Sequence, residues 1–226
     1  MSVILNIDTA TELAHVSMAR DGIVLSAYNN ETQKDHGSFL QPGIQQLVAT
    51  TGVDLKDIDA VAVTGGPGSY TGLRVGLASA KGLCYALSKP LIMLNTLEVL
   101  TESFFSTHEP LPPSTLYCPM IDARRLEVFT AIYDDQLTTI LPSQPMILEA
   151  HSFEEQLKNN AIIFFGNGSV KWHNLCQHPN ALFETVTILP EAMSRLSQRF
   201  FSLKQFADPA YSEPFYLKEF QTVTKR

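Results

Sequence analysis

The first thirty residues combine a short apolar run with a stretch of alternating hydrophobic and polar positions, both typical of β-strands. Residues 2–8 are largely apolar, residues 14–20 alternate, and residues 23–28 follow the turn signal Asp21-Gly22. A strand pair separated by such a turn is typical of a hairpin. The pattern therefore predicts a meander of three antiparallel strands at the start of the chain.

Helical and strand patterns alternate in the stretch that follows. Apolar residues at helical spacing and short apolar runs predict, in chain order, a helix over 38–49, a strand over 59–64, a helix over 73–88, a strand over 91–94 and a helix over 96–105. A meander followed by this alternation is the element order of an actin-like, ribonuclease-H-like α/β domain. We expect that fold class.

The second half of the chain repeats the beginning weakly. A shift of 114 residues superposes Ile7-Asp8 on Ile121-Asp122, where a second strand–turn–strand unit is expected to begin. Three prolines within residues 108–114 mark a linker. We expect two lobes, residues 1–107 and a reduced C-terminal lobe over about 115–226. The second lobe should contain a strand and helix over 147–157, a buried strand over 161–165 and a helix near 191–204.

Composition and charge narrow the functional classes by exclusion. The chain has 16 Lys and Arg against 23 Asp and Glu, a formal charge of −7, and neither half has a basic excess. Strong binding of nucleic acid by this chain alone is therefore not expected. No apolar run approaches the roughly 20 residues of a membrane-spanning helix. The three cysteines are scattered, and no basic leader precedes the first strand, so we expect a cytoplasmic protein without disulfides.

Residues 65–74 are the most informative stretch, because a buried-type strand leads there into a glycine-dense loop and then a helix. Such a loop presents amides at the positive end of a helix dipole, which suits an anion. No Gly-Lys-Ser/Thr closes it, so it is not a Walker A loop. Two interpretations stay open: contact with a phosphate or a partner, or glycines that let the backbone turn and pack closely. The candidate residues are Gly65, Gly66, Gly68, Ser69, Thr71 and Arg74.

Carboxylates at the ends of the two leading strands are a second candidate site. Asp8, followed by Thr9, and the equivalent Asp122 could together hold Mg²⁺ through water. The alternative is that each carboxylate caps its own turn. The six histidines include no pair four residues apart, the spacing that places two ligands on one helix face. We therefore expect no bound metal.

The helix predicted over 73–88 is unusually rich in small residues. Each glycine within a helix costs about 1 kcal/mol relative to alanine. Such residues are expected where another helix approaches closely, either in this chain or in another subunit. The candidate residues for a dimer interface are Leu73, Gly76, Leu77, Ala80, Gly82 and Tyr85.

Several segments resemble the bacterial TsaB family, and the resemblance extends over nearly the whole chain. They are residues 4–10, the glycine loop over 65–74, Asn95-Thr96-Leu97-Glu98, residues 121–128, and the late Pro214-Phe215-Tyr216-Leu217-Lys218, where the family ends in Arg. In the related TsaD family, the strand after the glycine-loop helix leads into a His-x-x-x-His motif that binds the catalytic metal. Here Asn95 and Val99 stand at those two positions.

The resemblance implies a non-catalytic subunit that helps add a threonylcarbamoyl group to the adenosine beside the tRNA anticodon. It implies a TsaD-like catalytic subunit and a TsaE-like ATPase as partners, with tRNA reached only through the complex and no contact with a membrane. It also implies that no catalytic residue, metal or cofactor is intrinsic to this chain. ATP and Mg²⁺ are then used by the complex, with at most a weak nucleotide contact here.

Because the two families share ancestry, a surface that binds the paralogue could also bind a second copy of this chain, so we expect a homodimer in isolation. Two alternatives from other classes remain. One is an autonomous small ATPase, sugar-kinase-like enzyme or peptidase. The other is an RNA-binding module, which the negative charge disfavours.

Overall fold

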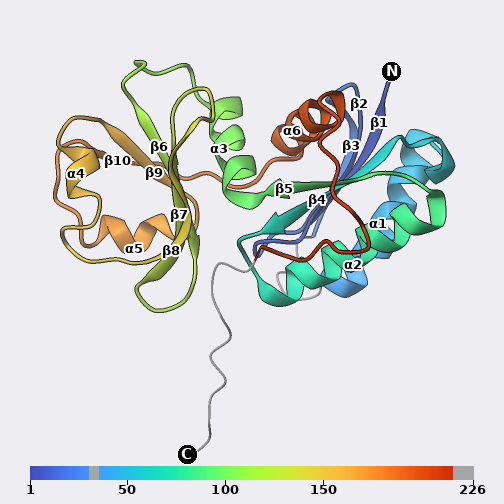
Figure 1. Ribbon diagram of the computed structural model, residues 1–226, viewed down its shortest axis with the longest axis horizontal. Helices are drawn as coiled ribbons and strands as arrows, with labels where there is room; N and C mark the ends of the chain where they lie inside the picture. Colours follow the sequence, from blue (N-terminus) through green and yellow to red (C-terminus); the bar gives the residue numbers. More distant parts are fainter. Residues whose placement is uncertain (31–35, 216–226) are drawn as a thin grey trace, which may run out of the picture.

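Two five-stranded sheets with the same strand order form the framework of the protein (Figure 1). The computed structural model describes residues 1–30 and 36–215. The first sheet has the order β3-β2-β1-β4-β5, and the second has the corresponding order β8-β7-β6-β9-β10. In each sheet the first three strands pair antiparallel and the last two join in parallel.

The strands of the first sheet are β1 (Val3–Asp8), β2 (His15–Arg20), β3 (Ile23–Asn29), β4 (Ala60–Gly66) and β5 (Leu91–Asn95). Those of the second are β6 (Leu116–Asp122), β7 (Glu127–Tyr133), β8 (Thr139–Ile147), β9 (Ile162–Phe165) and β10 (Ala181–Phe183). The helices are α1 (His36–Thr51), α2 (Tyr70–Leu87), α3 (Thr96–Thr107), α4 (Glu154–Leu157), α5 (Ser169–His173) and α6 (Pro190–Ser202), with a 3-10 turn at Leu55–Asp57.

The identical strand order of the two sheets confirms the predicted duplication and the actin-like α/β fold. The sequence analysis missed most of β8, all of β10 and the short helix α5. The reduction of the second unit lies in its helices rather than in its strands. α4 and α5 have 4 and 5 residues, whereas α1 and α2 have 16 and 18.

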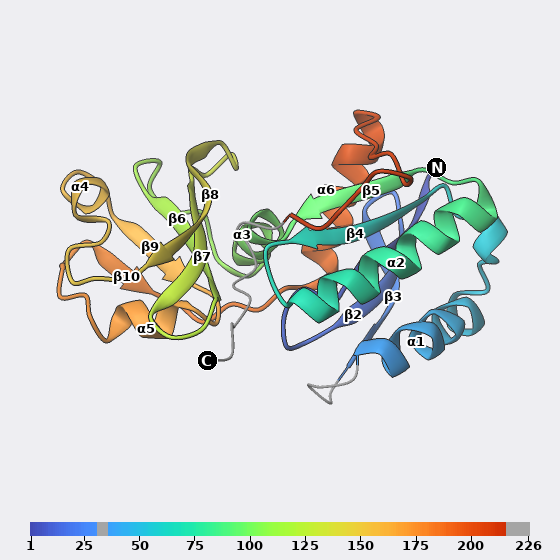
Figure 2. The same ribbon diagram turned by 60° about the horizontal axis from the view of Figure 1, so that its bottom comes forward.

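Both faces of the first sheet are covered by helices (Figure 2). One core contains Leu5 and Ile7 of β1 with residues of α1 and α2, and another contains Ile4 of β1 with Met193 and Leu196 of α6. Alternation along β1 therefore sends odd-numbered residues toward α1 and α2 and even-numbered ones toward α6. This separation decides the surroundings of Asp8 and Thr9.

The predicted boundary between the lobes is wrong for the last helix. All residues from about 115 onward were expected in the second lobe, yet α6 packs against β1, β2, β3 and β5 of the first sheet. The physical reason is that α1 and α2 leave one apolar face of that sheet open, and α6 buries it. Residues 205–215, here called the strap, also return to the first lobe, where Ala207 N donates to Leu91 O. Residues 216–226, with Tyr216, Leu217 and Lys218 of the late motif, lie outside the described residues.

The helix α3 lies between the two sheets and belongs to both cores (Figure 1). Its Val99 packs in the core beneath the first sheet, while Leu100 and Phe104 pack in a core of the second. Residues 108–115, which include the predicted linker, connect α3 to β6. In the described part of the chain, no helix is long and apolar enough to span a membrane.

The glycine loop is shorter than its sequence predicted. β4 continues to Gly66 and α2 already begins at Tyr70, three residues before the expected Leu73. The earlier start follows from capping, because the Ser69 side chain accepts a hydrogen bond from Gly72 N at 3.3 Å. Only Pro67, Gly68 and Ser69 lie between the two elements.

Candidate functional site

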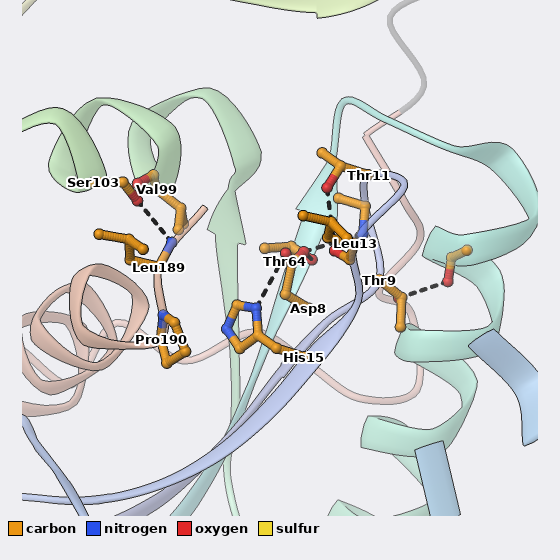
Figure 3. Close-up of polar contacts among 12 residues, drawn as sticks. Asp8, Thr9, Thr11, Leu13, His15, Thr64, Val99, Ser103, Leu189 and Pro190 are labelled. Atoms are coloured by element: carbon orange, nitrogen blue, oxygen red, sulfur yellow. Dashed lines mark hydrogen bonds and ion pairs between the residues drawn. The ribbon is translucent and has the colours of Figure 1, made fainter. Parts of the chain in front are cut away.

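The turn between β1 and β2 lies directly on the N-terminus of α2. Ser69 N donates to Ala10 O at 2.7 Å. The Thr9 hydroxyl donates to Gly72 O at 2.7 Å (Figure 3). Both Thr9 and Ala10 are completely buried. The amides of Ser69 and Gly72 thus have partners within the chain, Ala10 O and the Ser69 hydroxyl, where an anion would otherwise bind.

The glycines of this region are explained by the same contact. A Cβ at Gly68 would collide with Ala10 O, one at Gly72 with Thr9 O, and one at Gly76 with the Thr9 hydroxyl. Gly65 and Gly66 are buried at the end of β4 and lie against Phe215 of the strap. The geometry therefore favours close backbone packing over a phosphate cradle as the reason for the glycines.

Asp8 faces the opposite side of β1, toward β2 and α6. Its Oδ1 accepts hydrogen bonds from Ala10 N at 3.0 Å and from the Thr64 hydroxyl at 2.6 Å. Its Oδ2 lies 3.6 Å from His15 Nδ1 (Figure 3). Asp8 therefore caps the turn that Ala10 begins, which was the alternative to metal binding.

His15 and Thr64 complete this cluster, and neither was singled out from the sequence. Antiparallel pairing places His15 directly opposite Asp8, so strand register was the signal that could have found it. Burial lowers the pKa of His15 below its ordinary value, and the nearby carboxylates of Asp8 and Glu191 only partly oppose that effect.

Asp122 has different surroundings from its counterpart Asp8. Its side chain is partly exposed, and Oδ1 accepts hydrogen bonds from Lys171 Nζ at 2.7 Å and from Arg124 N at 2.6 Å. Between the lobes lies a cavity of about 90 Å³, lined by ten residues that do not include Asp8 or Asp122. The two carboxylates thus make separate contacts, each with its own lobe.

The cavity between the lobes is lined from both sides. Its lining residues are Thr11, Glu12, Leu13, Leu100, Ile121, Gly166, Asn167, Val186, Thr187 and Ile188. Ligand sites for small molecules usually have 300–1,000 Å³. This cavity is too small for a nucleoside triphosphate without a rearrangement of the lobes.

Asn95 and Val99, at the positions where the TsaD resemblance would place metal ligands, have structural roles. Asn95 caps α3: its Oδ1 accepts a hydrogen bond from Leu97 N at 2.9 Å, and its Nδ2 donates to the Ser143 hydroxyl at 3.0 Å. Val99 is completely buried in the core between α3 and the first sheet. Across residues 1–30 and 36–215, no cluster of three or more His, Cys, Asp or Glu residues could hold a metal ion.

The predicted dimer interface on α2 needs correction, because four of its six residues are inaccessible. Leu73, Gly76, Leu77 and Ala80 are buried against the first sheet and the β1–β2 turn. The helical stripe was therefore the core-facing side of α2. Of the six residues, Gly82 and Tyr85 are exposed, and a Cβ added at Gly82 would meet no described atom within 4 Å.

The exposed side of α2 also carries two candidates from the glycine loop. Thr71 and Arg74 lie on its first turns, and the Arg74 guanidinium stacks 4.0 Å from the centre of the Tyr70 ring. Together with Ala78, Gly82 and Tyr85 they form a stripe at helical spacing that faces away from the sheet.

Comparisons with known proteins identify the family of the chain. The model of the family described as "TsaD: tRNA N6-adenosine threonylcarbamoyltransferase" matches residues 24–197. The tRNA threonylcarbamoyladenosine biosynthesis protein TsaB of Escherichia coli is 29% identical over 222 residues, which cover 95% of this chain and 94% of that protein. The chain belongs to the TsaB family of TsaD-related proteins. The resemblance seen in the sequence is thereby confirmed.

Structural similarity extends over the same length. The structure of YeaZ from Pseudomonas aeruginosa is similar to this one with a TM-score of 0.79 and 25% sequence identity. The match covers 96% of this chain and 100% of the YeaZ chain. Similarity to a catalytic TsaD is more local. The tRNA N6-adenosine threonylcarbamoyltransferase of Clostridium perfringens is 41% identical over 80 residues, only 24% of its length.

Proposed function

We propose that the chain is a non-catalytic subunit in the biosynthesis of tRNA threonylcarbamoyladenosine and that it binds and activates a TsaD-type catalytic subunit. Family membership supports the pathway, since relatives that cover 95% and 73% of the chain carry that description. The observation that carries the non-catalytic role is the pair Asn95 and Val99. One caps a helix and the other is buried in the core, at the positions where the TsaD resemblance calls for metal ligands.

The proposal includes the absence of an intrinsic cofactor. The amides of Ser69 and Gly72 at the start of α2 are hydrogen-bonded within the chain, and the cavity between the lobes has only about 90 Å³. ATP and Mg²⁺ are then used elsewhere in the complex, by the catalytic subunit and a TsaE-like ATPase. The negative charge of −7 supports an indirect contact with tRNA, through the catalytic subunit. Such a complex would act in the cytoplasm.

Contact with the catalytic subunit is proposed to run over the exposed side of α2. Gly82 supports this location, because a Cβ there would meet no described atom within 4 Å and packing within the chain does not require a glycine. At Gly76 of the same helix, by comparison, a Cβ would collide with the Thr9 hydroxyl. A glycine in the middle of a helix costs stability, and close approach of a partner helix would offset that cost. In isolation the same side would pair with a second copy, and the homodimer would give way to the heterodimer when the paralogue is present.

Reconstitution tests the proposal directly. The purified chain is mixed with the TsaD-type protein of the same organism and a TsaE-type ATPase, and both co-elution and threonylcarbamoylation of tRNA are measured. We expect co-elution, modification that requires this chain, and no ATP hydrolysis by the chain alone. ATP turnover by the isolated chain at ordinary enzymatic rates would instead favour the autonomous ATPase.

A further inference from the structure

The strap connects three parts of the first lobe that are remote in sequence. Ala207 N donates to Leu91 O at 2.9 Å on β5, and Phe215 N donates to Gly65 O at 2.7 Å at the end of β4. Between these points, Lys81 Nζ of α2 donates to the carbonyls of Ala210 and Ser212, at 3.5 Å and 3.0 Å. The strap therefore runs from α6 past β5 to the side of α2 (Figure 1).

These contacts hold Tyr211 beside the exposed side of α2. Lys81 binds the two carbonyls that flank Tyr211, and Tyr85 follows Lys81 by one helical turn. Tyr211 is 85% exposed and Tyr85 is 90% exposed, the two highest values among the described aromatic side chains. Phe206 and Phe215 are 42% and 43% exposed and line an open hollow of about 380 Å³ along the strap.

The size of α2 indicates that a docking surface must extend beyond it. An 18-residue helix is about 27 Å long and about 10 Å wide, so one side offers roughly 270 Å². A stable interface buries about 800 Å² on each partner. The neighbouring α1 exposes the polar side chains Gln41, Gln45 and Gln46. The strap exposes Tyr211, and tyrosine is enriched among the residues that dominate binding energy.

The strap lies outside the part of the chain that matches the TsaD family model. The match to the TsaD family model ends at residue 197, so it includes α2 and excludes the strap. Both charged residues of the strap, Asp208 and Glu213, are acidic and exposed. A two-fold symmetric homodimer would bring two acidic straps to one interface, and the repulsion between like charges would disfavour it. A partner that brings no second acidic strap avoids this cost.

We propose that the strap, with Tyr211 at its centre, extends the docking surface of α2 and that the TsaD-type catalytic subunit occupies this joint surface. This inference rests on the proposed function and adds to it the part of the chain that favours the paralogue over a second copy. Lys81 is then a positioning residue, because it holds the strap against α2.

Affinity measurements on the full-length chain test the inference. The dissociation constant with the TsaD-type protein is measured for the wild type and for Tyr211→Ser, Tyr85→Ser and Lys81→Met. The matched control is Val170→Ser, which changes a residue 64% exposed on α5 in the other lobe. We expect Tyr211→Ser and Tyr85→Ser each to weaken binding about tenfold or more, in the range of hot-spot truncations. Lys81→Met should also weaken binding, whereas the control stays within about twofold and all melting temperatures stay close to wild type.

The outcomes separate this inference from the function on which it rests. If Tyr85→Ser weakens binding and Tyr211→Ser leaves it within about twofold, the strap inference is overturned and docking on α2 stands. If Tyr211→Ser weakens self-association alone, the occupant is a second copy and the inference is wrong. If the wild-type chain does not bind the TsaD-type protein at all, the inference and the proposed function both fail.

Discussion

Two glycines of one helix, Gly76 and Gly82, should respond in opposite directions to the same substitution. Both lie within α2, so replacement by alanine gives each position the same gain in helix propensity, about 1 kcal/mol. Their surroundings differ. A Cβ at Gly76 would overlap the Thr9 hydroxyl, whereas one at Gly82 meets no described atom within 4 Å.

The expected magnitudes follow from those contacts. At Gly82 the propensity gain is unopposed, so Gly82→Ala should stabilise the chain by about 1 kcal/mol. At Gly76 the new methyl group must displace a fully buried threonine, and overpacking typically costs about 1–3 kcal/mol. Displacement also strains the 2.7 Å hydrogen bond from Thr9 to Gly72 O, which contributes about 1 kcal/mol. We expect Gly76→Ala to destabilise by about 2 kcal/mol net.

Urea unfolding and thermal melting, both followed by circular dichroism, measure the two effects. For a chain of this size, 1 kcal/mol shifts the melting temperature by about 2–4 °C. Gly82→Ala should therefore melt about 2–4 °C higher than the wild type and Gly76→Ala about 4–8 °C lower. A double variant with Thr9→Ala should recover part of the loss, because the overlapping hydroxyl is gone.

Equal stabilisation by both alanines would refute this reasoning. It would mean that the β1–β2 turn yields freely and that the turn does not hold α2 in place. The close contact would then give no reason for the glycine at position 76, and the structural explanation of the glycine loop would lose its main support.

Three further predictions concern charge, docking and metals. The pKa of His15 is lowered in the folded chain, so the unfolded chain binds the extra proton more readily. The contribution of His15 to the free energy of unfolding should be fully present above pH 6.5 and be lost below it, by at most about 1.4 kcal/mol per pH unit. Urea unfolding at pH 7.5 and 5.5 measures the loss, which His15→Gln should reduce; an unchanged pH dependence would contradict the assignment. Gly82→Trp should leave folding intact and abolish co-elution with the TsaD-type protein in size-exclusion chromatography, and unaltered co-elution would place the contact elsewhere. Elemental analysis of the purified chain should find no stoichiometric zinc or iron, whereas one tightly held transition metal per chain would show a site that the described residues do not reveal.

Local pattern was sufficient for the elements and the fold class. The alternation in residues 14–28 and the short apolar runs on either side of it predicted β1 to β5 closely, because alternation indicates a strand and a short apolar run indicates a strand buried on both faces, as β1 and β4 are. The duplication was visible in the sequence because Asp8 and Asp122 each end the first strand of a unit. β10, with 3 residues, was missed because so short a strand carries too little periodicity to separate it from a loop.

Long-range contacts decided the site, and the sequence could not provide them. The sequence does not show which residue packs against a glycine. Only the folded chain shows that a Cβ at Gly76 would collide with Thr9, whereas one at Gly82 would meet no described atom within 4 Å. Helical spacing on α2 indicated that one side is apolar, but an apolar side fits the chain's own sheet and a partner's helix equally well. The packing on the first sheet resolved that ambiguity for Leu73, Leu77 and Ala80.

The sequence by itself determined that this chain is an acidic α/β protein with a repeated actin-like unit and the motifs of the TsaB family. Those properties depend on residue type and spacing, which can be read from the sequence without the fold. Only the tertiary structure decided that α6 and the strap return to the first lobe. Such pairings join residues far apart in the chain, and they depend on which apolar faces remain uncovered once the rest has folded.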